Sequence, residues 1–179
     1  MATVINTYAR AFADVVMSAK LDAPRTLAEA KQIVALTDEN RVLREVWDNP
    51  SIPSEQKRGV LDAIVQRAGI SRPVRNFMAV VIDKGRTRLL PEIVEQFAQD
   101  LNQRLGIAEA EITTARDLNK DERTMLEDDL ARVTGKKIKA SYEQDPGVLG
   151  GAIARVGGTI YDGSVKGQLE RIRKQLVNN

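Results

Sequence analysis

The residues whose types and spacing could support chemistry lie mainly in the last third of the chain. Residues 149–169 read LGGAIARVGGTIYDGSVKGQL, with glycine pairs at 150–151 and 157–158. A phosphate-binding loop needs a lysine and a hydroxyl directly after its glycines, or a strand, GxGxxG and a helix in that order. Each glycine pair here leads instead into a short alternating apolar stretch, which is typical of a strand. The first pair would let a strand pass close to another backbone, and the second would turn a hairpin.

Two further groups of side chains could act chemically, and we favour a structural interpretation of each. Ser164 as a nucleophile would need a base, and a sequence without histidine leaves only lysines or carboxylates for that role. Asp162 and Ser164 are therefore expected to cap the helix that follows them. The run Glu127, Asp128 and Asp129 could bind a hard cation, but adjacent acids on a helix point in different directions. We predict no catalytic, cofactor-binding or metal-binding residues in this chain.

The composition narrows the classes of function further. The 179 residues include no cysteine and no histidine, which excludes disulfides, thiolate chemistry and the usual general base near neutral pH. Aromatic residues make up only 4% of the chain, which is poor material for stacking nucleic-acid bases. Neither residues 1–105 nor residues 106–179 carry the positive excess of a nucleic-acid-binding domain. A nucleic-acid-binding helical module and an enzyme that uses carboxylates and lysines are kept as alternatives.

The distribution of apolar residues bears on membrane association and location. No apolar run approaches the roughly eighteen residues that span a bilayer, and the longest clear one covers residues 77–82. The first twenty residues lack the basic region, apolar block and cleavage site of a secretory signal. We therefore expect a soluble protein of the bacterial cytoplasm.

Apolar residues in the first 105 positions follow a helical period throughout. They recur at spacings of three and four, with turn-forming residues between the segments. Pro53 and Ser71 are placed to begin helices, and Gly69 and Gly85 to end them. Six short helices joined by tight loops predict a compact six-helix bundle over residues 1–105.

Two of these predicted helices, at residues 3–19 and 72–83, are apolar almost all the way round. In each, the polar residues form one narrow line along the helix. A helix of this kind must be covered on more than one side. Either both are central helices of the bundle, or they leave an apolar groove that binds the amphipathic helix of a partner.

Residues 106–179 change to a period of two, which is typical of strands. Four strands are predicted on this basis, at residues 108–114, 137–142, 152–156 and 159–162. Asn119 and Glu122 form a capping-box pattern for a helix that Gly135 closes. A second helix at the end of the chain completes a small α/β domain with a short sheet and two helices. The whole chain is therefore predicted to be of the α+β class.

Four groups of residues along the chain recur together in one known family. The most specific group is a glycine pair followed by D-G-S, and its residues are Leu149, Gly150, Gly151, Gly157, Asp162, Ser164 and Leu169. The other groups are Tyr8-Ala9-Arg10-Ala11-Phe12, Asn49-Pro50-Ser51-Ile52, and Asn76-Phe77 with Lys84-Gly85-Arg86. Together they resemble the delta subunit of the bacterial rotary ATP synthase, which is homologous to the mitochondrial oligomycin-sensitivity-conferring protein. The likeness covers the whole chain in length and order.

This resemblance implies a non-catalytic stator component of the proton-translocating ATP synthase. Such a protein links the catalytic head to the membrane-anchored peripheral stalk, so that the head does not turn with the rotor. Residues 1–105 are then expected to bind the α subunits of the head, and residues 106–179 the b subunits of the stalk. The protein would lie at the cytoplasmic face of the bacterial plasma membrane, peripheral to it through the complex. No cofactor, nucleic-acid partner or homo-oligomer is expected.

The resemblance also suggests where each partner binds. We place the α-subunit helix in the groove between the first and fifth predicted helices. The predicted lining of this groove is Tyr8, Ala11, Phe12, Val15, Val74, Phe77, Met78 and Val81. For the b subunits we favour the last helix and the adjacent strands, around Val165, Leu169, Ile172 and Leu176. These last four residues could instead belong to the core of the second domain.

Overall fold

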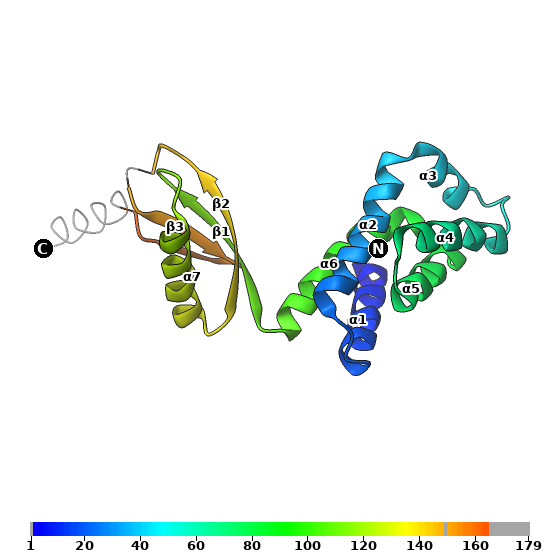
Figure 1. Ribbon diagram of the computed structural model, residues 1–179, viewed down its shortest axis with the longest axis horizontal. Helices are drawn as coiled ribbons and strands as arrows, with labels where there is room; N and C mark the ends of the chain where they lie inside the picture. The colour runs from blue at the N-terminus through cyan, green and yellow to red at the C-terminus, as the bar shows by residue number, and fades with distance from the viewer. Residues whose placement is uncertain (1, 149, 165–179) are drawn as a thin grey trace, which may run out of the picture. The chain divides into compact units, whose positions relative to one another are not determined.

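The structure of the protein is a computed structural model that describes residues 2–148 and 150–164 (Figure 1). The chain divides into two compact units, Met1–Leu101 and Asn102–Asn179. The first is helical, whereas the second combines a helix with a sheet (Figure 1). The described residues contain seven α-helices, one short 3-10 helix and a four-stranded sheet, so the predicted α+β class is confirmed.

The first unit is built from helices joined by short loops. The helices are α1 (Ala2–Ser18), α2 (Ala23–Glu39), α3 (Arg41–Asp48), α4 (Ser54–Ala68), α5 (Arg72–Asp83), η1 (Thr87–Leu89) and α6 (Leu90–Arg104). Local chemistry fixes several of their ends. Asp22 caps α2 by accepting a hydrogen bond from the Arg25 backbone N–H at 2.9 Å. Gly69 ends α4 in the left-handed conformation with a φ of 68°, as predicted.

A buried lysine closes the end of α3. The Nζ of Lys57, in α4, donates a hydrogen bond to the backbone carbonyl of Trp47 at 2.7 Å. Carbonyls in the last turn of a helix have no partner within the helix, and Lys57 supplies one. The helix ends at Asp48, and Asn49 follows as its C-cap.

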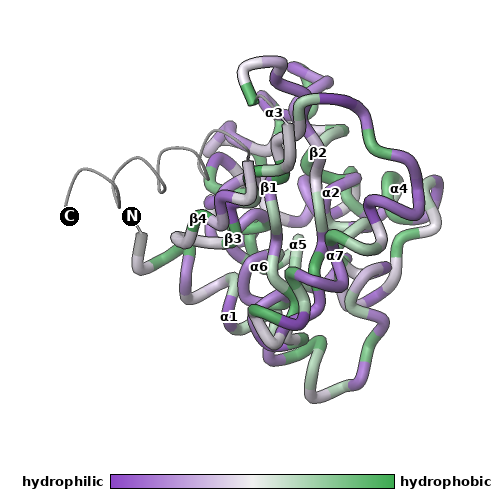
Figure 2. The backbone as a smooth tube through the Cα atoms, turned by 90° about the vertical axis from the view of Figure 1, so that its left-hand side faces the viewer, coloured by the Kyte–Doolittle hydropathy of each residue, from purple (hydrophilic) through white to green (hydrophobic). Residues whose placement is uncertain are grey.

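The core of the first unit is aromatic at its centre. The ring of Phe12 on α1 stacks on the ring of Phe77 on α5, with 4.1 Å between centroids and 5° between planes. The ring of Phe12 also packs against the ring of Phe97 on α6, with 4.6 Å between centroids. Hydrophobic and hydrophilic residues alternate along the backbone, as amphipathic helices require (Figure 2). Burying Phe12 therefore ties three helices together.

The second unit is a small sheet with one described helix. Its elements are β1 (Ile107–Thr114), α7 (Lys120–Thr134), β2 (Lys137–Gln144), β3 (Ala152–Val156) and β4 (Thr159–Asp162). The strand order is β2-β1-β3-β4, with β1 parallel to β2 and the other pairs antiparallel. α7 connects the two parallel strands, as a crossover must. It packs Leu126 and Leu130 against Ala110, Ile112 and Ala154 of the sheet.

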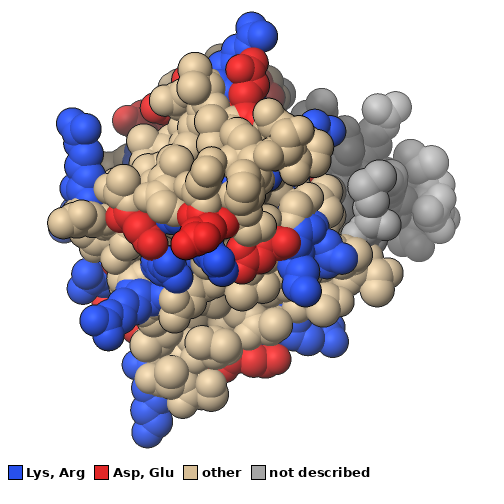
Figure 3. Space-filling view, turned by 90° about the vertical axis from the view of Figure 1, so that its right-hand side faces the viewer, with Lys and Arg blue, Asp and Glu red and all other residues tan. Residues whose placement is uncertain are grey.

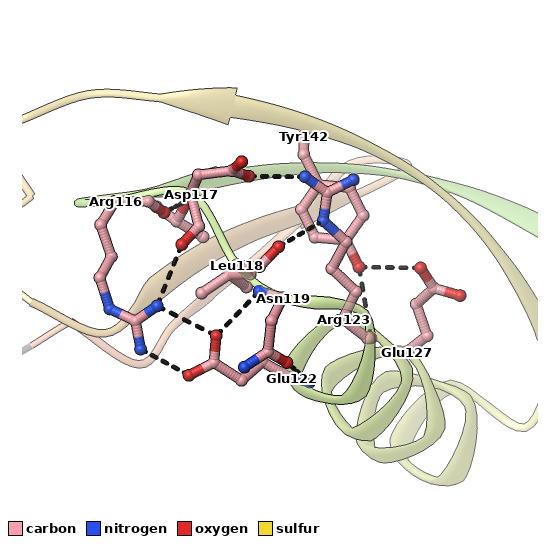
Figure 4. Close-up of polar contacts among 9 residues, drawn as sticks. Arg116, Asp117, Leu118, Asn119, Glu122, Arg123, Glu127 and Tyr142 are labelled. Carbon is pink, nitrogen blue, oxygen red and sulfur yellow. Dashed lines mark hydrogen bonds and ion pairs between the residues drawn. The ribbon is translucent and has the colours of Figure 1, made fainter.

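Polar contacts fix the start of α7 (Figure 4). Asn119 and Glu122 form the predicted capping box, in which each side chain accepts a hydrogen bond from the other residue's backbone N–H. Arg116 also binds Glu122 through two hydrogen bonds. The hydrogen bonds from Arg116 and from the Asn119 backbone lower the pKa of Glu122 to about 2. Gly135 ends the helix with a φ of 68°, as predicted.

A second group of contacts ties α7 to β2 (Figure 4). The Tyr142 hydroxyl donates to Glu127 at 2.8 Å, and the Arg123 guanidinium lies 4.6 Å from the centre of the Tyr142 ring. Burial, together with the hydrogen bond to Glu127, raises the pKa of Tyr142. Glu127, one of the acids considered above as a cation ligand, is thus engaged in holding the helix to the sheet.

The glycine pairs lie at the corners of the sheet. Gly151 has a φ of 81°, and a Cβ there would lie 2.5 Å from the carbonyl oxygen of Gly163. The close backbone approach predicted for the first pair is confirmed at this residue. The second pair turns the β3–β4 hairpin, as predicted, and Gly157 has a φ of 58° while Gly158 is outside the positive-φ region. Gly150 also has a positive φ, of 117°.

Candidate partner-binding groove

A groove of about 710 Å³ runs between α1 and α5 on the first unit. We call it the α1–α5 groove. It is lined by Thr7, Tyr8, Ala11, Phe12, Val15, Arg72, Pro73, Asn76, Phe77, Val80 and Arg86. Most of these residues are apolar, and the two charged ones are both arginines.

The two walls follow the helical repeat. On α1 the lining residues Tyr8, Ala11, Phe12 and Val15 are spaced by three, one and three positions. On α5 the residues at 73, 76, 77 and 80 repeat the same spacing. Such a set occupies one face of a helix over two turns, a length of about 10 Å. Each wall is therefore a continuous helical face.

The floor of the groove is closely packed and its walls are open. Phe12 is buried beneath the groove and stacks on half-buried Phe77. Val15 on one wall keeps 48% of its surface exposed, and Val80 on the other keeps 49%. Ala11 between them is also exposed. Large apolar side chains left open on both sides of a groove are typical of a docking surface.

The charge of the α1–α5 groove is positive. Among the described residues that line it, Arg72 and Arg86 are charged and no carboxylate is present. The Arg86 guanidinium lies 5.0 Å from the centre of the Tyr8 ring, a cation–π contact that holds it at the wall. An apolar floor beside two arginines fits an amphipathic helix that carries acidic residues.

The structure changes part of the predicted lining. Tyr8, Ala11, Phe12, Val15 and Phe77 do line the groove. The other three predicted residues, Val74, Met78 and Val81, do not, because their exposed fractions are 0%, 1% and 1% and they pack into the core of the first unit.

The remaining wall residues are ones that the sequence analysis did not place in the groove. On α5 they are Arg72, Pro73, Asn76 and Val80. Pro73, Asn76 and Val80 share the helical spacing of Phe77, and that spacing was the signal that could have found them. Arg86 lies beyond the end of α5, so the spacing of residues along the helix could not have placed it in the groove.

A buried carboxylate on α2 holds the start of α5. Ser71 precedes α5 as predicted, but its side chain makes no capping hydrogen bond, and its backbone N–H donates to Glu29 Oε2 at 2.9 Å. Arg25 Nε donates to the other oxygen of Glu29 at 2.8 Å. Burial raises the pKa of Glu29, but the hydrogen bonds from Ser71 and Arg25 outweigh this and hold the pKa below its ordinary value. Glu29 therefore stays charged and fixes one wall of the groove.

An ion pair fixes α5 from its other side. Arg75 donates two hydrogen bonds to Asp62 on α4, at 2.6 and 2.8 Å. This fork geometry is the strongest arrangement of a guanidinium and a carboxylate. The hydrogen bonds from Arg75 lower the pKa of Asp62. α5 is thus held by both α2 and α4, in addition to the stack of Phe77 on Phe12 of α1.

The predicted site for the stalk lies elsewhere in the chain. Val165, Leu169, Ile172 and Leu176 fall outside the described residues, as does the helix predicted to carry them. The adjacent structural motif is described in part. The Asp162 Oδ1 accepts hydrogen bonds from the backbone N–H and the hydroxyl of Ser164, at 2.9 and 2.6 Å. This turn leads the chain out of β4.

The surface charge gives no support to nucleic-acid binding. On the face of the first unit drawn in Figure 3, basic and acidic side chains are interspersed. A nucleic-acid site needs basic side chains gathered on one face.

Within residues 2–148 and 150–164, no helix is both long and apolar enough to cross a membrane.

Comparisons with known proteins point in one direction. A family model described as "ATP synthase delta (OSCP) subunit" matches residues 4–176. A protein of Koribacter versatilis named "ATP synthase subunit delta" is 48% identical over 98% of each chain. A protein of Acidobacterium capsulatum with the same name is 39% identical over 99% of each chain.

The fold has a counterpart among solved structures. One chain in a cryo-EM structure of the Toxoplasma gondii mitochondrial ATP synthase hexamer matches with a TM-score of 0.65. The match covers 97% of each chain at 17% sequence identity. At that identity the likeness is one of fold alone.

Proposed function

Because the chain belongs to the ATP synthase delta (OSCP) subunit family, we propose that its α1–α5 groove holds the catalytic head of the rotary ATP synthase. The family fixes the role of the chain, which is a non-catalytic component of the peripheral stalk of the synthase.

The occupant that we propose for the groove is an N-terminal helix of a synthase α subunit. A helix laid along two facing helical walls places its own apolar face on the floor made by Phe12 and Phe77. Its acidic residues would then meet Arg72 and Arg86. The open surface of Val15 and Val80 would be covered.

The physical task of a stator link explains why the groove is apolar. The link must stay bound while the rotor exerts torque on the head, so slow dissociation matters more than fast association. Burying one large apolar side chain stabilises a contact by about 1.5 to 3 kcal/mol, and such contacts keep their strength at physiological salt. A groove that covers several of them provides a long-lived attachment.

The second unit would attach to the b subunits of the stalk, around the end of the chain. Val165, Leu169, Ile172 and Leu176 remain the predicted contacts, together with the strands that precede them in the chain. The two units would then bridge head and stalk at the cytoplasmic face of the bacterial plasma membrane.

The observation that best supports this proposal is the open apolar groove above the Phe12–Phe77 stack. The family model matches the chain from residue 4 to residue 176. The test is recovery of the tagged full-length protein from solubilised membranes of its own organism. We expect the wild-type protein to recover the synthase α and b subunits. The Ala11→Asp protein should lose the α subunits and keep the b subunits. Recovery of nucleic acid, or of synthase without sensitivity to Ala11→Asp, would contradict it.

A further inference from the structure

A second groove, of about 840 Å³, lies between α2 and α6 with α1 beneath it. We call it the acidic groove. Its floor is apolar, with Ile5 of α1 and Val34 of α2 half-buried and Val94 of α6 buried. Ala35 and Pro91 are exposed along its sides. None of these five residues lines the α1–α5 groove, so the two grooves are separate surfaces.

The walls of the acidic groove also follow the helical repeat. On α2 the lining residues are at positions 31, 34, 35 and 38, which form one face over two turns. On α6 residues 92, 95, 96 and 99 do the same. Two facing helical walls of about 10 Å define an elongated trough that fits two turns of a third helix.

The charge of this groove is opposite to that of the α1–α5 groove. Asp38, Glu92 and Glu95 line it, and Lys31 is its single basic residue. Within the described part of the chain, none of the three carboxylates takes part in an ion pair. They are therefore available to the cations of a partner.

We propose that the acidic groove binds an amphipathic helix whose apolar stripe is flanked by lysines or arginines. Charge complementarity selects this occupant, because the same apolar stripe flanked by acids would place like charges beside Glu92 and Glu95. The first unit would then sort two helices by charge, an acidic one to the α1–α5 groove and a basic one to the acidic groove. This inference does not depend on the first groove being occupied by an α subunit.

α1 borders both grooves. Tyr8 and Ala11 line the α1–α5 groove, and Ile5, nearer the N-terminus of the helix, lines the acidic groove. The side of α1 that carries Ala9 and Ala13 is buried in the core of the first unit. The apolar residues of α1 are therefore shared between the core and the two grooves.

The test uses the full chain and two synthetic peptide helices that share one apolar stripe. One peptide carries lysines beside the stripe and the other carries glutamates. Isothermal titration gives the affinities, and amide chemical shifts give the site. We expect the lysine peptide to shift residues around Val34, Ala35 and Val94, and to bind less tightly as salt screens the exposed charges.

Matched variants separate the two grooves. Ala35→Arg places a cation in the acidic groove and should weaken the lysine peptide by at least about tenfold. Ala28→Arg, at an exposed position of the same helix outside both grooves, should leave the affinity unchanged. Circular dichroism checks that each variant keeps its helices.

Two results would overturn the inference. The first is a lysine peptide whose affinity does not change in folded Ala35→Arg. The second is a lysine peptide whose amide shifts fall around Ala11 and Phe77 rather than around Val34 and Val94, because it then occupies the α1–α5 groove. Either result leaves the proposed function intact, since that rests on the other groove and on recovery of the synthase.

Discussion

Replacing Ala11 by aspartate places a carboxylate at the middle of the α1–α5 groove while sparing the core. Ala11 is exposed, so the new side chain has room in the free protein. Aspartate costs about 0.7 kcal/mol relative to alanine inside a helix. Asp14, three positions on, adds a like-charge repulsion of about 0.2 to 0.5 kcal/mol. A loss of about 1 kcal/mol leaves a domain of ordinary stability folded.

The effect on binding should be much larger. A helix seated in the groove would cover the new carboxylate, and burying an unpaired charge costs several kcal/mol. Arg72 and Arg86 line the same groove and would offset part of that cost. We therefore expect a loss of about 2 to 4 kcal/mol, which is about 30-fold to 1,000-fold in affinity.

The assay is titration of the full chain with a peptide that spans the N-terminal segment of the α subunit from the same organism. Ala28→Asp is the matched control, because Ala28 is an exposed alanine of α2 outside both grooves. It carries the same change of charge and helix propensity. Thermal unfolding of both variants confirms that they stay folded.

The reasoning would be refuted by wild-type affinity in a folded Ala11→Asp protein. It would also be refuted by equal losses in Ala11→Asp and Ala28→Asp, because the effect would then come from net charge alone.

Three further predictions concern how the fold supports these surfaces. Gly151→Ala should lower the free energy of unfolding of the second unit by about 1 to 3 kcal/mol, because a Cβ at this position meets backbone atoms. Gly158→Ala should change that free energy little, because a Cβ there meets nothing. Urea unfolding of both variants measures the difference. Glu29→Gln should lower the stability of the first unit by about 1.5 to 3 kcal/mol, read from Trp47 fluorescence, since the hydrogen bonds from Arg25 and from the Ser71 backbone just before α5 lose their charged acceptor. The pKa of Glu122 is lowered, so its contribution to stability is complete above pH 4.5 and is lost as the pH falls toward about 2. The amide signals of α7 should therefore lose protection over that pH range in the wild-type protein. Glu122→Gln should show no such step.

Features fixed by local chemistry could be predicted from the sequence. The capping box of Asn119 and Glu122 and the left-handed caps at Gly69 and Gly135 each depend on a few neighbouring residues. The close approach at Gly151 was also accessible, because a glycine pair between strands has few other uses. Ser71 marks the start of α5 correctly, but its partner Glu29 lies 42 positions away and no local pattern announces it.

The orientation of α5 could not be predicted in the same way. Val74, Met78 and Val81 form one apolar stripe, and Phe77 with Val80 begins another on the adjacent side of the helix. Residues one position apart are rotated by about 100°, so either stripe could have faced the core. The acceptors Glu29 and Asp62, which hold Ser71 and Arg75, lie on other helices, so the sequence of α5 alone does not show which stripe turns inward.

Arg86 shows why the electrostatics of the groove needed the fold as well. The chain reverses at Gly85, whose φ is 63°, and the Arg86 backbone N–H donates to the carbonyl of Val81 at 3.0 Å. This turn brings the guanidinium back to the Tyr8 ring on a different helix. A positive groove beside α1 therefore arises from a helix terminus rather than from any run of basic residues, and the acidic groove likewise draws its carboxylates from two helices. Each groove takes its charged residues from more than one element of the fold. The near-neutral composition of the chain therefore does not reveal that one groove carries positive charge and the other negative charge.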